Sequence, residues 1–445
     1  MNDPVYFIAI YFLLALSVGI YSYFKIKSPA DYYIAGKKAG VIPVSGSLLA
    51  TILGGSAILG TIELSKNAGW AALWFLFCAS LGLFILAPMT KYVSRYGKYT
   101  LPGLLSHFFG RQAQFISSLI IPVAWLGIIA AQIIAAGKIL AGLGVANYQW
   151  SVVICGIIFI IYTLIGGQVS ILKTDVIQAI LIIAGLSALT FFSFKTIGHE
   201  SLTGFNMHSL FNESFTGIDL LVLILTYSVT FIVGPDIYSR VFCSKDEKTA
   251  TRSVLIVAFM LIPASFVLTY LGIISGISGE NGIISFANAY LPGWLYGLLL
   301  AALLSAVMSS ADTTLLTSSL ILSELIISNL EEKGSLLITR ILIVILGGLS
   351  IVIALFVTSI LQSLLLALTF FSGAFVLPMI AGLLGLPVVK KQLVTAIITG
   401  GLIALAGKLI SVFFLPFTGN LLILVGLIVN GTLLFINWNK LLKYN

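Results

Sequence analysis

The chain has 445 residues, of which 59% are hydrophobic and 9% are charged, and its mean hydropathy is +1.14. This composition excludes a water-soluble globular domain and is typical of a polytopic, all-α membrane protein. The formal net charge of +8 would suit a nucleic-acid partner, but the basic residues lie in the loops between apolar segments, which membrane topology explains. We therefore expect a lipid bilayer around the chain and no nucleic-acid partner.

Apolar stretches of about 20 residues, each long enough to cross a hydrocarbon core about 30 Å thick, recur along the whole chain. We expect about 13 transmembrane helices, at 4–24, 41–64, 70–91, 115–142, 149–166, 169–194, 218–242, 252–275, 293–326, 336–357, 360–385, 391–415 and 419–438. The first is expected to be a retained helix rather than a cleaved signal, because Asp3 precedes it and Lys25 and Lys27 follow it.

The basic residues indicate the orientation. All but four of the 23 Lys and Arg residues, with Arg240 among the majority, fall on the side of the membrane that the chain reaches after its first predicted span. The exceptions are Lys66, Lys138, Lys195 and Lys408. Because cytoplasmic loops carry an excess of Lys and Arg, we expect a multi-pass protein of the plasma (cytoplasmic) membrane with its N-terminus outside and its C-terminus in the cytoplasm.

Two predicted helices are interrupted at related places, at Gly54-Gly55 and at Gly234-Pro235. A break frees backbone groups that cost several kcal/mol each in hydrocarbon, so it persists where it lines a cavity or binds a ligand. Two matching breaks predict a 5+5 inverted-repeat core with a broken first helix in each repeat. We expect an extra N-terminal transmembrane helix in 1–30, a first inverted repeat in 41–194, a second in 218–385, and two additional C-terminal transmembrane helices in 391–445.

The cysteines and histidines do not form the patterns of a metal or catalytic site. Cys78, Cys155 and Cys243 lie in or beside predicted spans without C-x-x-C spacing, which favours packing roles. The histidines, which are His107, His199 and His208, fall in predicted loops, so no intramembrane base is indicated. We expect neither an enzyme nor a cofactor other than a coupling ion.

Three segments resemble a known family. They are Asp31-Tyr-Tyr-Ile-Ala-Gly36 leading into Gly46-Ser-Leu-Leu-Ala50-Thr51, then Tyr162-Thr-Leu-Ile-Gly166-Gly167 followed by Thr174-Asp175-Val-Ile-Gln178, and finally Ser305-Ala-Val-Met-Ser309-Ser310-Ala-Asp312. Together, over about 4–385, they look like the sodium:solute symporters, which include sodium–glucose, sodium–proline and sodium–sialic acid cotransporters. The resemblance implies the leucine-transporter-like inverted-repeat fold.

The resemblance also implies a sodium site. Sodium is a hard cation that prefers oxygen ligands, and a helix break supplies free carbonyl groups. The implied ligands are the carbonyls of Ala50, Leu53 and Ala306 and the hydroxyls of Ser309 and Ser310. The alternative for the two serines is hydrogen bonding to carbonyls of their own helix or helix packing.

Two carboxylates, Asp175 and Asp312, fall within predicted spans, where an unpaired charge costs on the order of 2.5–3.5 kcal/mol. In some members of the family, the equivalent of Asp175 and nearby hydroxyls bind a second sodium. Here Ser309, Asp312 and Thr313 occupy those hydroxyl positions. Two close carboxylates either bind a cation together or share a proton, and Lys173 is a further candidate partner for Asp175.

The substrate site is expected at the two breaks. The candidates are Gly55, Ser56 and Ala57 after the first break, Phe231 and Asp236 around the second, Gln132 in 115–142, and Thr369, Phe370 and Ser372 in 360–385. Asp236 either faces the substrate or pairs with Arg240 four residues later, and the local pair is favoured. No arginine is expected within the membrane to bind a carboxylate.

This set predicts a secondary active transporter that couples inward sodium flow to uptake of a small organic solute. Sugar-transporting relatives have a polar Glu-Gln pair where this chain has Ser56-Ala57, so an amino acid or monocarboxylate is favoured over a sugar. The alternatives are a proton-coupled symporter of the same fold and a transporter-derived membrane sensor. The expected partners are the solute, sodium and the bilayer, with no obligatory protein partner.

Overall fold

The computed structural model describes residues 4–24, 26–144, 146–197, 207–277, 282–327, 330–332 and 334–436. Eleven helical stretches in these residues are long and apolar enough to cross a membrane. Two of them, Gly55–Tyr96 and Tyr148–Lys195, are 42 and 48 residues long, about twice the length that one crossing needs. The all-α polytopic class is confirmed, whereas the exact number of spans stays a prediction.

The helices follow the predicted spans with small shifts of their ends. Their bounds are α1 Pro4–Tyr23, α2 Pro29–Ile34, α3 Val41–Ile52, α4 Gly55–Ala68, α5 Leu73–Tyr96, α6 Leu101–Phe109, α7 Arg111–Gly142, α8 Tyr148–Ile197, α9 Gly217–Leu223, α10 Val229–Val233, α11 Pro235–Cys243, α12 Glu247–Ile277, α13 Ile283–Tyr290, α14 Gly293–Ile326, α15 Ser335–Phe356, α16 Ile360–Leu383, α17 Leu393–Phe413 and α18 Pro416–Phe435. A π-helical turn, Ile224–Ser228, joins α9 to α10. His107 lies in α6 rather than in a loop, because the Thr100 side chain caps that helix, and His199 lies outside the described residues.

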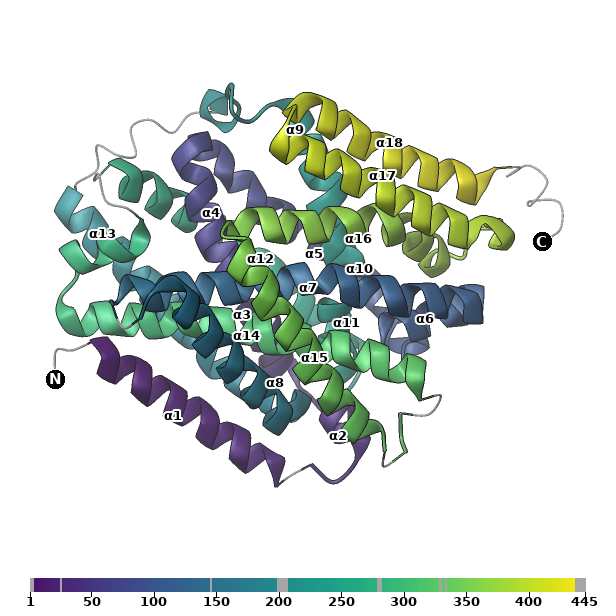
Figure 1. Ribbon diagram of the computed structural model, residues 1–445, viewed down its shortest axis with the longest axis horizontal. Coiled ribbons are helices and arrows are strands. Elements are labelled where there is room, and N and C mark those ends of the chain that lie inside the picture. Colours follow the sequence, from purple (N-terminus) through teal and green to yellow (C-terminus); the bar gives the residue numbers. More distant parts are fainter. Residues whose placement is uncertain are drawn as a thin grey trace.

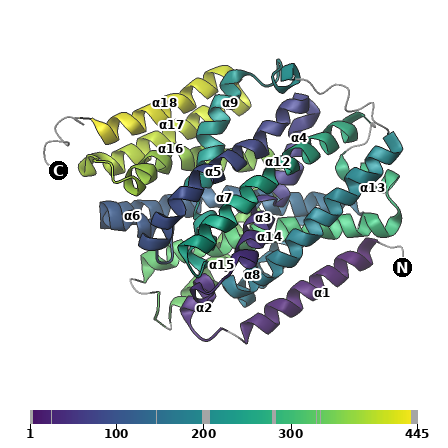
Figure 2. The ribbon, with the colours of Figure 1, turned by 180° about the vertical axis from the view of Figure 1, so that it is seen from behind.

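The helices surround a buried centre. Figures 1 and 2 show α1 along one flank of the molecule and α17 with α18 along the opposite flank. The most apolar window of α14 is 89% buried, against 28% for α1, so α14 is a core helix and α1 a peripheral one. This arrangement places the serines and the carboxylate of α14 in the interior.

The first predicted break lies between α3 and α4. These helices have 12 and 14 residues, or about 18 and 21 Å, so each crosses only part of the bilayer. At the break α14 approaches the backbone closely, since a Cβ added to Gly54 would lie 1.9 Å from Ser310 Oγ. Only glycine fits at this position.

The second break separates α10 from α11. Gly234 is extended, and Pro235 begins α11, the position where a missing N–H costs nothing. The far end of α11 lies beside the start of α3, because Ala39 N–H donates to the Cys243 carbonyl at 3.0 Å and Lys245 N–H donates to the Ala39 carbonyl at 3.0 Å. The two half-helices therefore run from one face of the protein to the two breaks.

A third irregularity bends α8. Gly167 has φ of 55°, which favours glycine, and a Cβ there would lie 2.5 Å from the Tyr32 ring. The Tyr32 hydroxyl donates to the Thr163 carbonyl at 3.2 Å. Two of the segments that carry the family resemblance thus contact each other at this corner.

We predict that Gly54→Ala lowers the thermal unfolding midpoint of the detergent-purified protein, because its methyl group would displace Ser310. Gly348→Ala is the matched control, since nothing lies within 4 Å of a Cβ added there. The control should unfold at or above the wild-type temperature, because alanine is favoured over glycine in a helix. Equal midpoints for the two variants would contradict the close approach of α14.

Candidate functional site

A buried ion pair lies where α3, α8, α11 and α14 meet. Arg240 of α11 and Asp175 of α8 are both fully buried, and Arg240 Nη2 lies 3.2 Å from Asp175 Oδ2. The guanidinium also donates to Ser47 Oγ at 3.0 Å and to Thr51 Oγ1 at 2.9 Å, both on α3. Further bonds reach the hydroxyls of Ser239, at 3.0 Å, and Thr313. These contacts compensate the positive charge of the Arg240 guanidinium, whose burial away from water would otherwise be costly.

This geometry corrects three interpretations. Arg240 is not a cytoplasmic loop residue but lies about 7.5 Å into α11 from the break, so an arginine is present in the interior. It pairs with Asp175 and not with Asp236, because α11 directs the two side chains to different neighbours. Lys173 does not supply the partner of Asp175, since its Nζ lies 3.5 Å from Ser22 Oγ and over the Tyr21 ring.

The carboxylates and hydroxyls of the expected second cation site come together around this pair. Ser309 Oγ donates to Asp175 Oδ1 at 2.6 Å, and Ser47 donates to Asp175 Oδ2. Asp312 is fully buried, and its Oδ2 has no hydrogen-bond partner among the described residues. One guanidinium therefore lies near two carboxyl groups. When both are ionised, one further monovalent cation would balance the charge.

The expected sodium ligands lie beside this cluster. Ala50, Leu53 and Ala306 are buried, and the last carbonyls of α3 have no donor within their own helix. Ser310 Oγ donates to the Thr51 carbonyl at 2.6 Å. Ser309 and Ser310 thus bond to other helices, which disfavours the alternative that they merely bond to their own helix.

An internal cavity of about 80 Å³ lies at both helix breaks. Five of the expected substrate residues line it, namely Ser56, Ala57, Gln132, Phe231 and Asp236. The remaining lining comes from Thr51, Ile52, Trp125, Ile128, Tyr227, Thr230, Gly234, Ile237, Ser310, Thr314, Leu364 and Leu368. Ser310 therefore belongs both to this cavity and to the expected sodium site.

Two hydrogen-bonded pairs organise the polar part of the cavity. Gln132 Nε2 donates to Ser56 Oγ at 2.6 Å, and Ser56 N–H donates to Gln132 Oε1 at 3.2 Å. Trp125 Nε1 donates to Asp236 Oδ1 at 2.5 Å. Asp236 is the one charged residue among the described residues that line the cavity.

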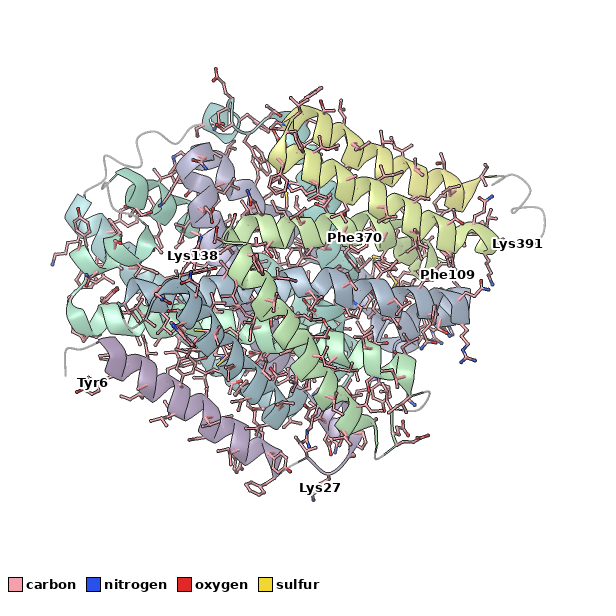
Figure 3. All side chains as sticks on the ribbon, in the orientation of Figure 1. Tyr6, Lys27, Phe109, Lys138, Phe370 and Lys391 are labelled. Carbon is pink, nitrogen blue, oxygen red and sulfur yellow. The ribbon has the colours of Figure 1, made fainter. Side chains whose placement is uncertain are left out.

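Four expected substrate residues do not line the cavity. Gly55 faces Val307 of α14, and Phe370 (Figure 3) faces α17, where a Cβ on Gly401 would lie 3.1 Å from its ring. The Ser372 hydroxyl donates to the backbone carbonyl of Thr369 in its own helix at 3.0 Å. From α16 the cavity is lined by Leu364 and Leu368, and Ser372, four residues further on the same face, lies one helical turn beyond them.

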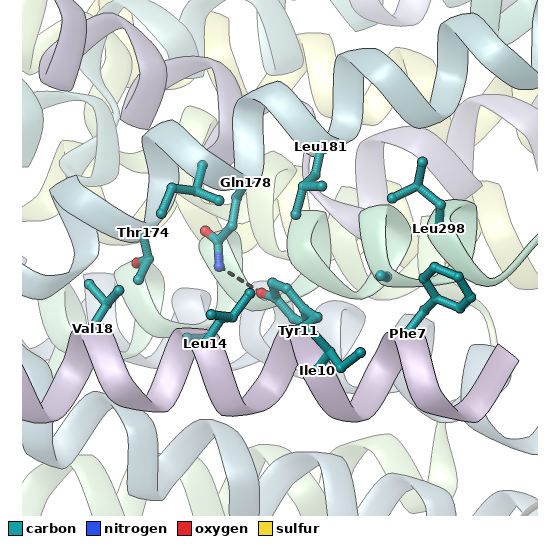
Figure 4. A pocket seen from close by; sticks show the side chains of 12 residues that line it. Phe7, Ile10, Tyr11, Leu14, Val18, Thr174, Gln178, Leu181 and Leu298 are labelled. Carbon is teal, nitrogen blue, oxygen red and sulfur yellow. Dashed lines mark hydrogen bonds between the residues drawn. The ribbon is translucent and has the colours of Figure 1, made fainter. Parts of the chain in front are cut away.

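Two other cavities lie away from the breaks. One of about 480 Å³, beyond the far end of α4, is lined by Glu63, Lys66 and Lys138 among apolar residues. Another of about 140 Å³, between α1, α8 and α14, is almost wholly apolar, and Figure 4 shows its main polar contact, Gln178 Nε2 donating to the Tyr11 hydroxyl at 2.7 Å. The first offers three charged side chains but lies away from both breaks, and the second offers a polar solute few hydrogen-bonding groups.

Sequence reasoning missed several residues of the site, above all Ser47, Thr51, Trp125 and Tyr227. Ser47 and Thr51 are four residues apart and so share a face of α3, a signal that was available. The four residues between Arg240 and Lys245 carry no charge. This also indicates that the helix extends beyond Arg240 before its end reaches water. Nothing in the sequence marks the π-helical turn that places Tyr227 at the cavity.

Comparison with known proteins identifies the family. The sequence model of the sodium:solute symporter family matches residues 32–391. The chain belongs to this family. The chain is 25% identical to human sodium/glucose cotransporter 4 over 202 residues and 26% identical to the mouse protein over 199 residues. Each match covers 43% of this chain and 29% of the relative, so it spans less than a third of those longer proteins.

Solved structures confirm the leucine-transporter-like fold of the chain. A Na⁺-coupled sialic acid symporter in a substrate-bound outward-open state has 19% identity and a TM-score of 0.75, with 96% of this chain and 97% of that chain covered. A nucleobase-cation-symport-1 family transporter with bound bromovinylhydantoin has 13% identity and a TM-score of 0.58, with 91% and 93% covered. The low identities limit the structural likeness to the fold.

We predict that Arg240→Gln or Asp175→Asn alone destabilises the protein by about 3–5 kcal/mol, because each leaves a buried charge without its partner. The double variant should recover part of this loss, which a double-mutant cycle of unfolding free energies in detergent would measure. The exposed pair Lys98–Glu331, whose side chains are 74% and 54% exposed, is the control and should show a coupling of about 0–1 kcal/mol. Additive losses at Arg240 and Asp175 would show that the two charges do not interact.

Proposed function

We propose that this protein is a secondary active transporter of the cytoplasmic membrane, with its N-terminus outside. It couples inward sodium flow to uptake of a small organic solute, an amino acid or a monocarboxylate rather than a sugar, by alternating access. The observation that carries the proposal is the position of Ser310, which lines the cavity and donates to the Thr51 carbonyl at the first break.

The coupling follows from this shared residue. A sodium ion held by Ala50, Leu53, Ala306, Ser309 and Ser310 would fix the end of α3 against α14. The same two elements form part of the wall of the cavity, so the ion and the solute would stabilise the same arrangement of helices. Each ligand then raises the affinity for the other by the same factor.

The chemistry of the cavity disfavours a sugar. Its volume is small, and Ser56 and Gln132 satisfy each other through two hydrogen bonds. The lining from α16 and from Ile52, Ile128 and Ile237 is apolar. A polyol would leave several hydroxyl groups without partners, at a cost of about 1–3 kcal/mol each.

Asp175, Asp312 and Thr313 form a second candidate cation site. The unpartnered Oδ2 of Asp312 favours an additional monovalent cation there. This observation also supports the competing function, a proton-coupled symporter of the same fold, in which the two carboxylates share the transported proton.

We predict that Ser309→Ala combined with Ser310→Ala removes sodium stimulation of solute uptake in proteoliposomes, because both hydroxyl ligands are lost while the helix is preserved. Ser318→Ala combined with Ser319→Ala is the matched control on the same helix. Those hydroxyls donate to the carbonyls of Thr314 and Leu315 in their own helix at 2.7 Å, so sodium stimulation should be unchanged. Undiminished sodium stimulation in the first variant would refute the site.

The pH dependence of uptake tests whether sodium or a proton binds at Asp175 and Asp312. If sodium occupies the site, uptake remains sodium-driven at alkaline pH and weakens in acid, because protons compete with sodium for the carboxylates. Asp312→Asn should weaken that competition. Uptake driven by a pH gradient in sodium-free buffer, and abolished by Asp312→Asn, would establish the proton-coupled alternative instead.

A further inference from the structure

The cavity at the breaks contains a negative charge without a cationic partner. The described residues supply one hydrogen bond to the Asp236 carboxylate, from Trp125 to Oδ1. Asp236 is half-buried and lines the cavity, and no Lys, Arg or His is among the described residues that line it. The charge is therefore directed toward the space that a solute would fill.

The nearest buried cation is committed elsewhere. Arg240, one helical turn from Asp236, makes its bonds with Ser47, Thr51, Ser239, Thr313 and Asp175. Its ion pair with Asp175 takes it away from the cavity. Asp236 thus lacks the direct ion pair that Asp175 has, although an uncompensated carboxylate is costly where it is partly removed from water.

Aromatic residues form another part of the cavity wall. The aromatic residues Trp125, Tyr227 and Phe231 line the same space as Asp236. Tyr227 and Phe231 lie edge to face with ring centroids 5.0 Å apart. Aromatic faces attract ammonium groups, and the attraction strengthens where water is excluded.

We propose that the transported solute carries an ammonium group and that Asp236 is its counter-ion. This inference rests on the transport function proposed above and narrows it, because a solute whose only charge is a carboxylate would face repulsion from Asp236. The ammonium group donates to the Asp236 oxygen that Trp125 leaves free. An amino acid satisfies this requirement, and so does a simple amine, whereas a monocarboxylate without an amine does not.

Asp236 could instead serve only to anchor Trp125, and Asp236→Asn separates the two roles. Asparagine has nearly the same shape, and its side-chain oxygen still accepts the hydrogen bond from Trp125. The substitution therefore removes the charge while it preserves the anchor. Asp246→Asn is the matched control, because Asp246 caps α12 outside the cavity and asparagine is an equally good cap.

The test uses the purified full chain and pairs of probes that differ in one group. Each common L-amino acid is compared with its 2-hydroxy acid, for example L-alanine with L-lactate, and ethanolamine is compared with ethylene glycol. Binding is followed by thermal stabilisation and titration, with and without sodium. We expect at least one ammonium probe to bind at least about 30-fold more tightly than its hydroxyl partner, from the roughly 2 kcal/mol or more that a buried charge pair contributes.

Asp236→Asn should abolish this preference and leave the dissociation constant of sodium unchanged, and Asp246→Asn should retain the preference. Failure of every ammonium probe to bind, an equal or stronger affinity for the hydroxyl partners, or an unchanged preference in Asp236→Asn would overturn the inference. Sodium-enhanced binding of a solute without an amine would overturn it while the proposed transport function stands. An amine preference that depends on Asp236 but not on sodium would leave the inference standing and refute the coupling.

Discussion

The interaction on which the site depends is the buried ion pair between Arg240 and Asp175. A guanidinium and a carboxylate lose their hydration at this depth, and only close geometry with further hydrogen bonds offsets that loss. The hydroxyls of Ser47, Thr51 and Thr313 supply those bonds, so α3, α11 and α14 are held to α8 at one point. The end of α3 and the start of α11 are thereby kept together, and the free backbone groups at both breaks face a common space.

The helix α14 joins the two halves of the site because successive residues on it face different neighbours. Consecutive side chains of a helix are about 100° apart, so Ser309 reaches Asp175 while Ser310 reaches the Thr51 carbonyl at the cavity. Any shift of α14 relative to α3 therefore changes the ion ligands and the cavity wall together. A rigid element shared by both sites is a physical basis for coupling that needs no long pathway between them.

The sequence predicts what depends on local rules and composition. The membrane class, the breaks at Gly54 and Gly234, and the gathering of Ser309, Ser310, Asp175 and Asp312 follow from apolar length, helix breakers and the family motifs. The hydrogen-bond partner of Asp236 does not follow from these features. A spacing of four residues favours a pair with Arg240, but tertiary packing brings Trp125 to Asp236 from 111 positions away in the sequence. The part of α16 that meets the cavity could not be predicted either, since its few polar residues do not mark that part and Ser372 bonds to its own helix.

The charges at the centre give the two proposals a common consequence. The described residues place three carboxyl groups, those of Asp175, Asp236 and Asp312, and one buried guanidinium, that of Arg240, in this region. With all three carboxyl groups ionised, the protein alone would hold two negative charges in excess. When the solute is a simple amine, one cation at the hydroxyl and carboxylate cluster and one ammonium group at Asp236 would neutralise the centre. An amino acid also brings a carboxylate, and a second cation is then needed. A rearrangement that closes both sites from water is least costly when the enclosed charge is zero, because uncompensated charge is penalised most in a low dielectric. Movement of the carrier with only one of the two ligands bound would enclose a net charge, and this electrostatic penalty would itself couple the flow of the ion to the flow of the solute.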